Sequence, residues 1–235
     1  QISAPEGFDY YLIKLDGVTG EAGFKETENF GRLEYSFSEL VKKCGIDMTE
    51  CSLIEENGRA HFLTKRFDRE NGRKIHMQTL CGMAHYDFRL KNGHSYEQAF
   101  NVMRRLRLPY SQAQEMFRRI VFNVVVRNQD DHTKNISFLM DSSGQWSLSP
   151  AYDMGFAYNP LGAWTATHQM SINGKFDNIT RADLLSLANA NNIKNASEII
   201  DQVCETTAGW PELAKNCGVP QKMIDGIVPH MLLSL

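Results

Sequence analysis

The sequence predicts an α+β fold in two lobes: a small antiparallel β lobe at residues 1–70 and a larger, mainly helical lobe at residues 71–235. A paired-strand pattern around Asn57-Gly58 occupies the first part, whereas apolar residues at helical spacing dominate the second. The stretch 68–73 between them (DRENGR) has no apolar residue and is the natural boundary. This order of elements predicts an α+β arrangement with a cleft between the lobes.

The small lobe should contain three strands and one helix. Residues 8–16 alternate and are rich in aromatic and branched side chains, which indicates a strand. Residues 29–44 carry an apolar stripe at helical spacing, and Gly45 is a typical residue after a helix end. Residues 51–55 and 60–67 flank the Asn-Gly turn and should pair as a hairpin.

The sequence of the helical lobe contains clear patterns for the beginnings of helices. Ser95-x-x-Gln98 is a capping box, which opens a helix that should end near Arg107. A second helix begins after Pro109 and keeps an apolar period to Val125. The other expected elements are a hairpin over residues 136–149, a helix opened by Thr180-x-x-Asp183, and two or three C-terminal helices.

Composition narrows the class of protein. The chain has 235 residues, 42% of them apolar, and a net charge of −3, so nothing indicates a whole-chain nucleic-acid binder. Its five cysteines are irregularly spaced without a C-x-x-C pair, which favours reduced thiols in the cytoplasm. No apolar run approaches the roughly 20 residues that cross a bilayer, so we expect no membrane association.

The connection at residues 127–138 (RNQDDHTKNISF) concentrates polar groups between a buried helix and a strand. Asp130 is followed by Asn135 five residues later, then by a hairpin and by Asp153. This is the order of parts in the catalytic half of a protein kinase, where the first Asp orients the attacking hydroxyl and the Asn and second Asp hold magnesium. Alone, each residue is more simply a helix-ending or turn residue, but the combined order favours catalysis.

A lysine and a glutamate strengthen this interpretation. Lys14 lies in an apolar strand, and Glu34 lies within the apolar stripe that includes Phe30, Phe37 and Val41. A carboxylate in such a stripe is costly without a cationic partner, and Lys14 is a candidate. A strand lysine paired with a helix glutamate holds nucleotide phosphates in kinases. The glycines at 17, 20 and 23 come after Lys14 rather than before it, so we interpret them as a flexible connection.

Together these residues resemble the HipA family, bacterial serine/threonine kinases that are often the toxins of toxin–antitoxin operons. The resemblance covers most of the chain and rests on three motifs. They are Asn128-x-Asp130-x-His132-x-Lys134-Asn135, Pro150-x-Tyr152-Asp153 and, upstream, Lys65-Arg66-Phe67-Asp68-Arg69.

The resemblance implies a role for each matching residue. Asp130 would be the catalytic base, and Asn135 and Asp153 would bind Mg²⁺. The nucleotide-binding residues that the resemblance and the pattern above indicate are Lys14, Glu34, Lys65, Arg66, Phe67, His132, Lys134 and Tyr152. Of these, Lys14 would contact the phosphates of ATP, and residues 65–67 would form the hinge that meets adenine.

The resemblance also implies partners: a protein substrate, such as an aminoacyl-tRNA synthetase or another translation factor, and an antitoxin protein, with DNA reached only through the antitoxin. The family's N-terminal subdomain and the Gly-rich phosphate loop before the lysine strand are not evident, so we expect weak activity from this chain alone. Two alternatives remain open. One is a metal-dependent hydrolase or nuclease that uses Asp130, Asp131 and His132, and the other is a catalytically silent module that binds a partner protein.

Overall fold

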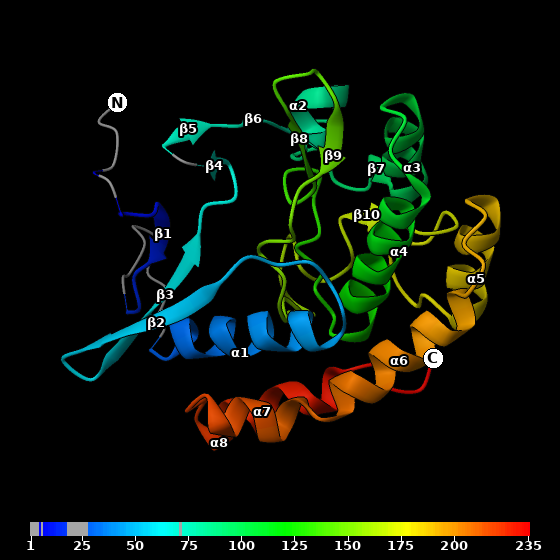
Figure 1. Ribbon diagram of the computed structural model, residues 1–235. Helices are drawn as coiled ribbons and strands as arrows, with labels where there is room; N and C mark the ends of the chain where they lie inside the picture. The colour runs from blue at the N-terminus through cyan, green and yellow to red at the C-terminus, as the bar shows by residue number, and fades with distance from the viewer. Residues whose placement is uncertain (1–4, 6, 18–27, 71) are drawn as a thin grey trace.

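The computed structural model describes residues 5, 7–17, 28–70 and 72–235, and it confirms the predicted α+β class. The first sheet consists of β1 (Tyr11–Lys14), β3 (Arg59–Lys65) and β2 (Cys51–Glu56), in the order β1-β3-β2 with antiparallel pairing. The predicted hairpin turns at Asn57 and Gly58, whose φ values are +50° and +77°. In Figure 1 this hairpin reaches out from the left side of the molecule, with α1 (Phe30–Lys43) running beside it.

Strand β1 begins three residues later and ends two residues earlier than predicted, and its earlier end is explained by Asp16, where the chain turns to meet α1. The Asp16 carboxylate accepts the backbone N–H groups of Asn29 and Phe30 at 3.0 and 3.1 Å, so it caps the first turn of the helix. The backbone N–H of Asp16 in turn donates to Nδ1 of His61 at 2.9 Å. This junction fixes the start of α1 against the end of β1. The first residue of α1, Phe30, lies four residues before Glu34.

Helix α1 packs closely on the first sheet. A Cβ atom at Gly31 would lie 1.9 Å from the carbonyl oxygen of Ala60, so only glycine permits this approach. Phe37 and Val41 are buried as the apolar stripe predicts, but Phe30 is 51% exposed. The prediction for Phe30 was wrong because it stands at the first turn, where the helix reaches the edge of a surface depression.

A second sheet has the order β6-β8-β9 and joins β6 (His76–Thr79) to the hairpin of β8 (Ser137–Met140) and β9 (Trp146–Leu148). The hairpin was predicted, but β6 was not, because four residues are too few for a periodic signal. The predicted boundary region forms the two-residue strands β4 (Arg69–Glu70) and β5 (Arg73–Lys74). The division into domains at residue 70 stays a prediction.

Helices are the main regular structure of the remaining chain, and the predicted capping box at Ser95 and Gln98 is present. Helix α4 (Tyr110–Val125) lies at the centre of the core, with Ile120, Val121 and Phe122 fully buried. The remaining elements are α2 (Leu80–Ala84), β7 (His94–Ser95), α3 (Tyr96–Arg105), α4 (Tyr110–Val125), β10 (Met170–Ser171), α5 (Arg181–Ala190), α6 (Ala196–Ala208), α7 (Trp210–Asn216), α8 (Gln221–Ile227) and a 3-10 turn (Val228–His230). No helix of the described residues is long and apolar enough to cross a membrane.

Candidate active site

The segment that carries Asp130 leaves the buried end of α4 and runs beside the segment that follows Asp153. The backbone N–H of Gln129 donates to the carbonyl of Ala157 at 3.2 Å, and the N–H of Ala157 donates to the carbonyl of Arg127 at 3.1 Å. Asp153 itself has a φ of +57°, a conformation that non-glycine residues adopt rarely. These contacts bring two carboxylates that are far apart in the sequence to one place.

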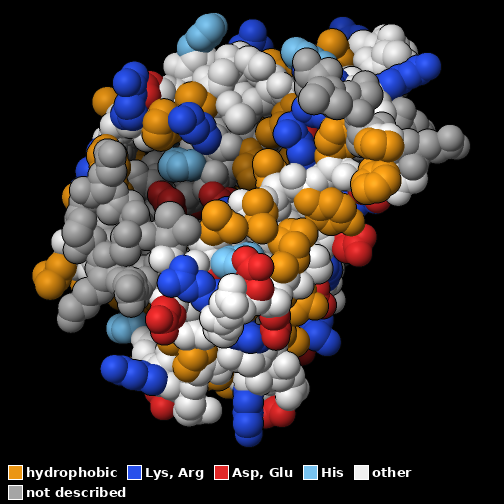
Figure 2. Space-filling model, turned by 90° about the vertical axis from the view of Figure 1, so that its left-hand side faces the viewer, with side chains coloured by type: hydrophobic (Ala, Val, Ile, Leu, Met, Phe, Trp, Pro, Cys, Tyr) orange, Lys and Arg blue, Asp and Glu red, His pale blue; other side chains and the backbone are white. Residues whose placement is uncertain are grey.

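Lys14, Glu34, Asp130 and Asp153 line a single cavity of about 160 Å³. They come from β1, from α1, from the loop after α4 and from the loop after β9. The rest of the wall is mostly apolar and includes Phe37, on the buried side of α1. Figure 2 shows acidic side chains recessed in a hollow on this face, with apolar side chains gathered beside it. The four charged residues that the sequence analysis identified therefore lie around one cavity.

Lys14 makes two ion pairs. Its Nζ lies 2.5 Å from Oε1 of Glu34 and 2.6 Å from Oδ1 of Asp153. Burial alone would lower the pKa of Lys14, but the negative charges of Asp153 and Glu34 outweigh this effect and raise it above 10.5. Burial raises the pKa of Glu34, and the positive charge of Lys14 partly offsets this rise. The predicted Lys14–Glu34 contact is therefore present, with Asp153 as a further partner.

The Asp130 carboxylate accepts no hydrogen bond from the described residues, so it is free to accept one from a bound molecule. Burial raises its pKa above 3.8, and the nearby negative charges of Asp153 and Asp131 raise it further, whereas His132 opposes the shift. A half-buried carboxylate of raised pKa at a cavity wall is a common feature of general bases.

Asn135 and Asp153 could contribute oxygens to a metal ion. The Asn135 side-chain nitrogen donates to the carbonyl of Asp130 at 2.9 Å, which leaves its amide oxygen without a partner among the described residues. Both residues line a second small cavity that adjoins the first. The described residues contain no group of three or more His, Cys, Asp or Glu placed to hold a metal ion. An ion here would depend on one amide, one carboxylate and oxygens from a bound nucleotide, which suits magnesium.

The side chains of the predicted hinge are already paired. Nζ of Lys65 lies 2.6 Å from Asp9, and Arg66 donates two hydrogen bonds to Asp68 at 2.8 and 2.7 Å. The Phe67 ring instead packs on the Tyr152 ring, with 5.6 Å between centroids. Of the three predicted hinge residues, Phe67 is the one whose side chain contacts the segment that carries Asp153.

His132 and Lys134 do not line the cavity of Lys14. The His132 ring meets the edge of Phe88 at 5.6 Å, and Nζ of Lys134 lies 3.5 Å from the centroid of the same ring. Tyr152 is linked to this segment, since its hydroxyl donates to the carbonyl of Lys134 at 2.6 Å. Phe88 had no sequence signal, because an isolated aromatic residue in a loop has no informative period.

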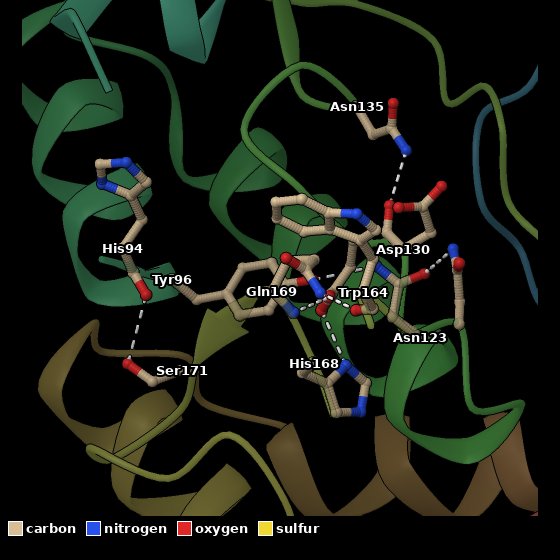
Figure 3. Close-up of polar contacts among 11 residues, drawn as sticks. His94, Tyr96, Asn123, Asp130, Asn135, Trp164, His168, Gln169 and Ser171 are labelled. Carbon is tan, nitrogen blue, oxygen red and sulfur yellow. Dashed lines mark hydrogen bonds and ion pairs between the residues drawn. The ribbon is translucent and has the colours of Figure 1, made fainter. Parts of the chain in front are cut away.

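Asp131 differs from its neighbour Asp130, because its side chain is only 1% exposed. Its carboxylate accepts hydrogen bonds from the Tyr96 hydroxyl at 2.7 Å, from Nδ1 of His168 at 2.8 Å and from the backbone N–H of Gln169 at 2.7 Å. These groups converge from α3 and from the segment before β10 (Figure 3). Because the oxygens of Asp131 are occupied, the structure does not support its use as a metal ligand in a hydrolase.

Of the Gly17, Gly20 and Gly23 pattern, the last two positions lie outside the described residues.

Comparison with known protein families assigns the chain to one of them. The sequence profile of the HipA-like C-terminal domain matches residues 2–210. The chain belongs to this family. Two relatives are a Haemophilus influenzae protein named "Putative kinase", 29% identical over 136 residues, and the Sinorhizobium fredii protein "Putative kinase Y4dM", 27% identical over 218 residues. The matches cover 51% and 84% of this chain but 39% and 52% of those relatives, so the chain spans about half of their length or less.

Solved structures give the same fold. HipA in the Shewanella oneidensis MR-1 complex of HipA, HipB and operator DNA superposes with a TM-score of 0.67 at 19% identity, over 94% of this chain and 55% of HipA. The Helicobacter pylori proinflammatory kinase CtkA superposes with a TM-score of 0.57 at 14% identity, over 97% of this chain and 90% of CtkA. At such identities the likeness establishes the fold, which is that of the HipA-like kinases.

Proposed function

We propose that this HipA-like chain is the core of a protein serine/threonine kinase, which transfers the γ-phosphoryl group of ATP to a hydroxyl of a protein. The observation that carries the proposal is the meeting of Lys14, Glu34, Asp130 and Asp153 in one cavity. In this proposal residues 1–70 form the nucleotide-binding lobe, and residues 71–235 form the catalytic lobe.

Each side chain has a task that its surroundings permit. Asp130 accepts the proton of the acceptor hydroxyl and orients it, because no group of the described chain competes for its carboxylate. The Lys14 ammonium, held by Glu34, neutralises charge on the nucleotide phosphates. Asn135 and Asp153 hold Mg²⁺, which supplies positive charge at the phosphate oxygens. For Asp153 this requires its contact with Lys14 to loosen or be shared when nucleotide binds.

The remaining predicted residues surround the nucleotide in this proposal. Phe67 and Tyr152, whose rings are in contact, offer an apolar surface for adenine beside the hinge. The side chains of Lys65 and Arg66 are paired with Asp9 and Asp68, and their backbone N–H groups already donate to carbonyl groups, so these two residues contribute through their backbone carbonyl groups. His132 and Lys134 both contact Phe88, and His132 lines the second cavity together with Asn135 and Asp153.

We also propose the biological setting that the family suggests, the toxin of a toxin–antitoxin pair. The likeness to HipA in complex with HipB and operator DNA supports an antitoxin partner, through which DNA would be reached. Translation factors such as aminoacyl-tRNA synthetases are candidate protein substrates. A cytoplasmic location agrees with the five cysteines, all of which are unpaired.

Calorimetric titration with ATP, with and without Mg²⁺, tests the central proposal together with a phosphate-transfer assay. We expect magnesium-dependent ATP binding that Asp153→Asn abolishes. Asp201→Asn is a matched control, since Asp201 is also half-exposed and ion-paired, with Arg181 at 2.7 Å, but lies on α6. Binding of a metal ion with no effect of ATP would favour a hydrolase, and binding of neither would favour a partner-binding module.

A further inference from the structure

Asp131 connects the loop of Asp130 to two distant parts of the chain. One oxygen accepts the backbone N–H of Gln169, and the other accepts the Tyr96 hydroxyl and the Nδ1 of His168. His168 is 3% exposed and Tyr96 is 1% exposed, so these bonds form away from water. Burial and the negative charge of Asp131 raise the pKa of Tyr96 well above 10, so its hydroxyl remains a donor. Hydrogen bonds to a buried charged group are among the stronger ones in proteins.

The network continues to the other side of Asp130. The Tyr96 hydroxyl accepts from the side-chain nitrogen of Asn123 at 3.0 Å, and the Asn123 side-chain oxygen accepts from Asn128 at 3.0 Å. Asn128 is 3% exposed and lines the same cavity as Asp130. The residues on both sides of Asp130 are therefore fixed by one continuous set of buried and partly buried hydrogen bonds.

The backbone at Asp130 is held from both directions as well. Gln129, which precedes it, donates its N–H to Ala157 at 3.2 Å, and Asp131, which follows it, is held by its three donors. The carbonyl of Asp130 accepts from Asn135 at 2.9 Å (Figure 3). The carboxylate of Asp130 has no such restraint from the described residues. Its direction therefore depends on how precisely the surrounding backbone is held.

We propose that Asp131 and His168 are positioning residues for phosphoryl transfer, which hold the backbone beside Asp130 so that its carboxylate faces the acceptor hydroxyl. This role rests on the proposed kinase function. A displacement of a reacting group by about 1 Å can lower a rate by about 10²-fold. Loss of the Asp131 contacts should therefore reduce turnover, while nucleotide affinity, which depends on Lys14 and Asp153, changes little.

The competing explanation is that Asp131 only stabilises the fold, and the chain offers a matched control for it. Asp183 is another buried carboxylate, with its side chain 4% exposed, and it accepts from Lys175, Asn173 and Thr180. It lies in the first turn of α5 and lines neither of the two site cavities. Asp183→Asn should lower stability in the same way as Asp131→Asn, but without a specific effect on turnover.

The experiment compares kcat, ATP affinity and unfolding midpoint in Asp131→Asn, Asp183→Asn, His168→Ala and His168→Asn. We expect kcat to fall about 10- to 100-fold in Asp131→Asn and His168→Ala, with ATP affinity within about twofold of the wild type. An Asn side chain places its nitrogen near the position of Nδ1 of histidine, so His168→Asn should recover most of the lost kcat. Asp183→Asn should keep the kcat of its folded fraction.

The outcomes separate this inference from the proposed function. A wild-type protein that transfers phosphate, with Asp131→Asn no less active than Asp183→Asn at equal folded fraction, overturns the positioning role alone. Equal losses of kcat in His168→Ala and His168→Asn overturn the part assigned to His168. A wild-type protein that transfers no phosphate overturns the kinase function and this role with it.

Discussion

Asp130 and Asp131 are adjacent in the sequence and chemically identical, yet the structure gives them opposite surroundings. The Asp131 side chain is 1% exposed and accepts three hydrogen bonds. Asp130 lines an open cavity, accepts no hydrogen bond from the described residues, and has its pKa raised mainly by burial. The fold therefore supplies hydrogen bonds to the Asp131 carboxylate and leaves the Asp130 carboxylate available to a bound molecule.

This difference indicates how one short loop can be both rigid and reactive. Hydrogen bonds stabilise a buried carboxylate but also occupy the lone pairs that a base needs. The chain therefore places the restraint on Asp131 and the reactivity on Asp130. Four predictions test this contrast, in order of expected effect.

The largest expected effect is on stability, in Asp131→Ala. The change leaves the Tyr96 hydroxyl, the His168 ring and the Gln169 amide without their acceptor in a buried place. At about 1–3 kcal/mol for each unsatisfied group, we expect a loss of roughly 3 kcal/mol or more in the free energy of unfolding. Asp130→Ala should cost far less, because no donor among the described residues loses its partner. Denaturant titration of both variants measures the difference, and equal losses would contradict the contrast.

The second effect is on catalysis, in Asp130→Asn. This variant keeps the shape of the side chain and removes the base, so turnover should fall by about 10²-fold or more. ATP affinity should change little, because the phosphates and metal are assigned to Lys14, Asn135 and Asp153. Phosphate-transfer rates, ATP titration and thermal melts on the same sample check this. If activity instead falls only in proportion to unfolding, Asp130 is merely a loop residue.

The contrast also shows what the sequence could predict. The order of Asp130, Asn135 and Asp153 indicated a kinase-like site, because those residues lie near turns whose positions are set by local pattern. Lys14 and Glu34 could be paired because a carboxylate in an apolar stripe requires a cation. The α+β class followed from the same local signals, and the structure confirms it.

The features that could not be predicted from the sequence depend on contacts between distant segments. Nothing near Asp131 in the sequence identifies His168 or Tyr96, which lie 37 and 35 residues away. Likewise, Asp16 looked like the end of a strand, whereas it caps α1 across 14 residues. A single sequence records which residues need partners but not which distant residues supply them.

The third effect is on nucleotide binding, in Lys14→Ala. The Lys14 ammonium is the positive group next to Glu34 and Asp153 in the cavity, so we expect ATP affinity to fall about tenfold or more. Stability should fall only slightly, since the side chain is half-exposed and such ion pairs contribute about 1 kcal/mol or less. Lys42→Ala, which removes another ion-paired lysine near the end of α1, is the control. Unchanged ATP affinity in Lys14→Ala would remove its assigned role.

The smallest effect is a change in pH dependence. The pKa of Asp130 is raised above 3.8, mainly by burial, so its protonated form is favoured in the folded protein. The stability that this group contributes is therefore present below about pH 3.8 and is lost as the pH rises through the folded-state pKa. The acid limb of kcat/KM, which reports the free enzyme, should lie above pH 3.8 for the same reason.

His132 gives this last prediction a direction that can be tested. Its positive charge lowers the pKa of Asp130 and so opposes the effect of burial. His132→Ala removes the opposing charge and should move the acid limb of kcat/KM to higher pH, whatever happens to the maximum rate. His76→Ala removes a histidine that packs on Trp146 in the second sheet, and it should leave the limb in place. A limb that stays fixed in His132→Ala, or moves to lower pH, would mean that the titrating group is not Asp130, because removing a nearby positive charge raises the pKa of a carboxylate.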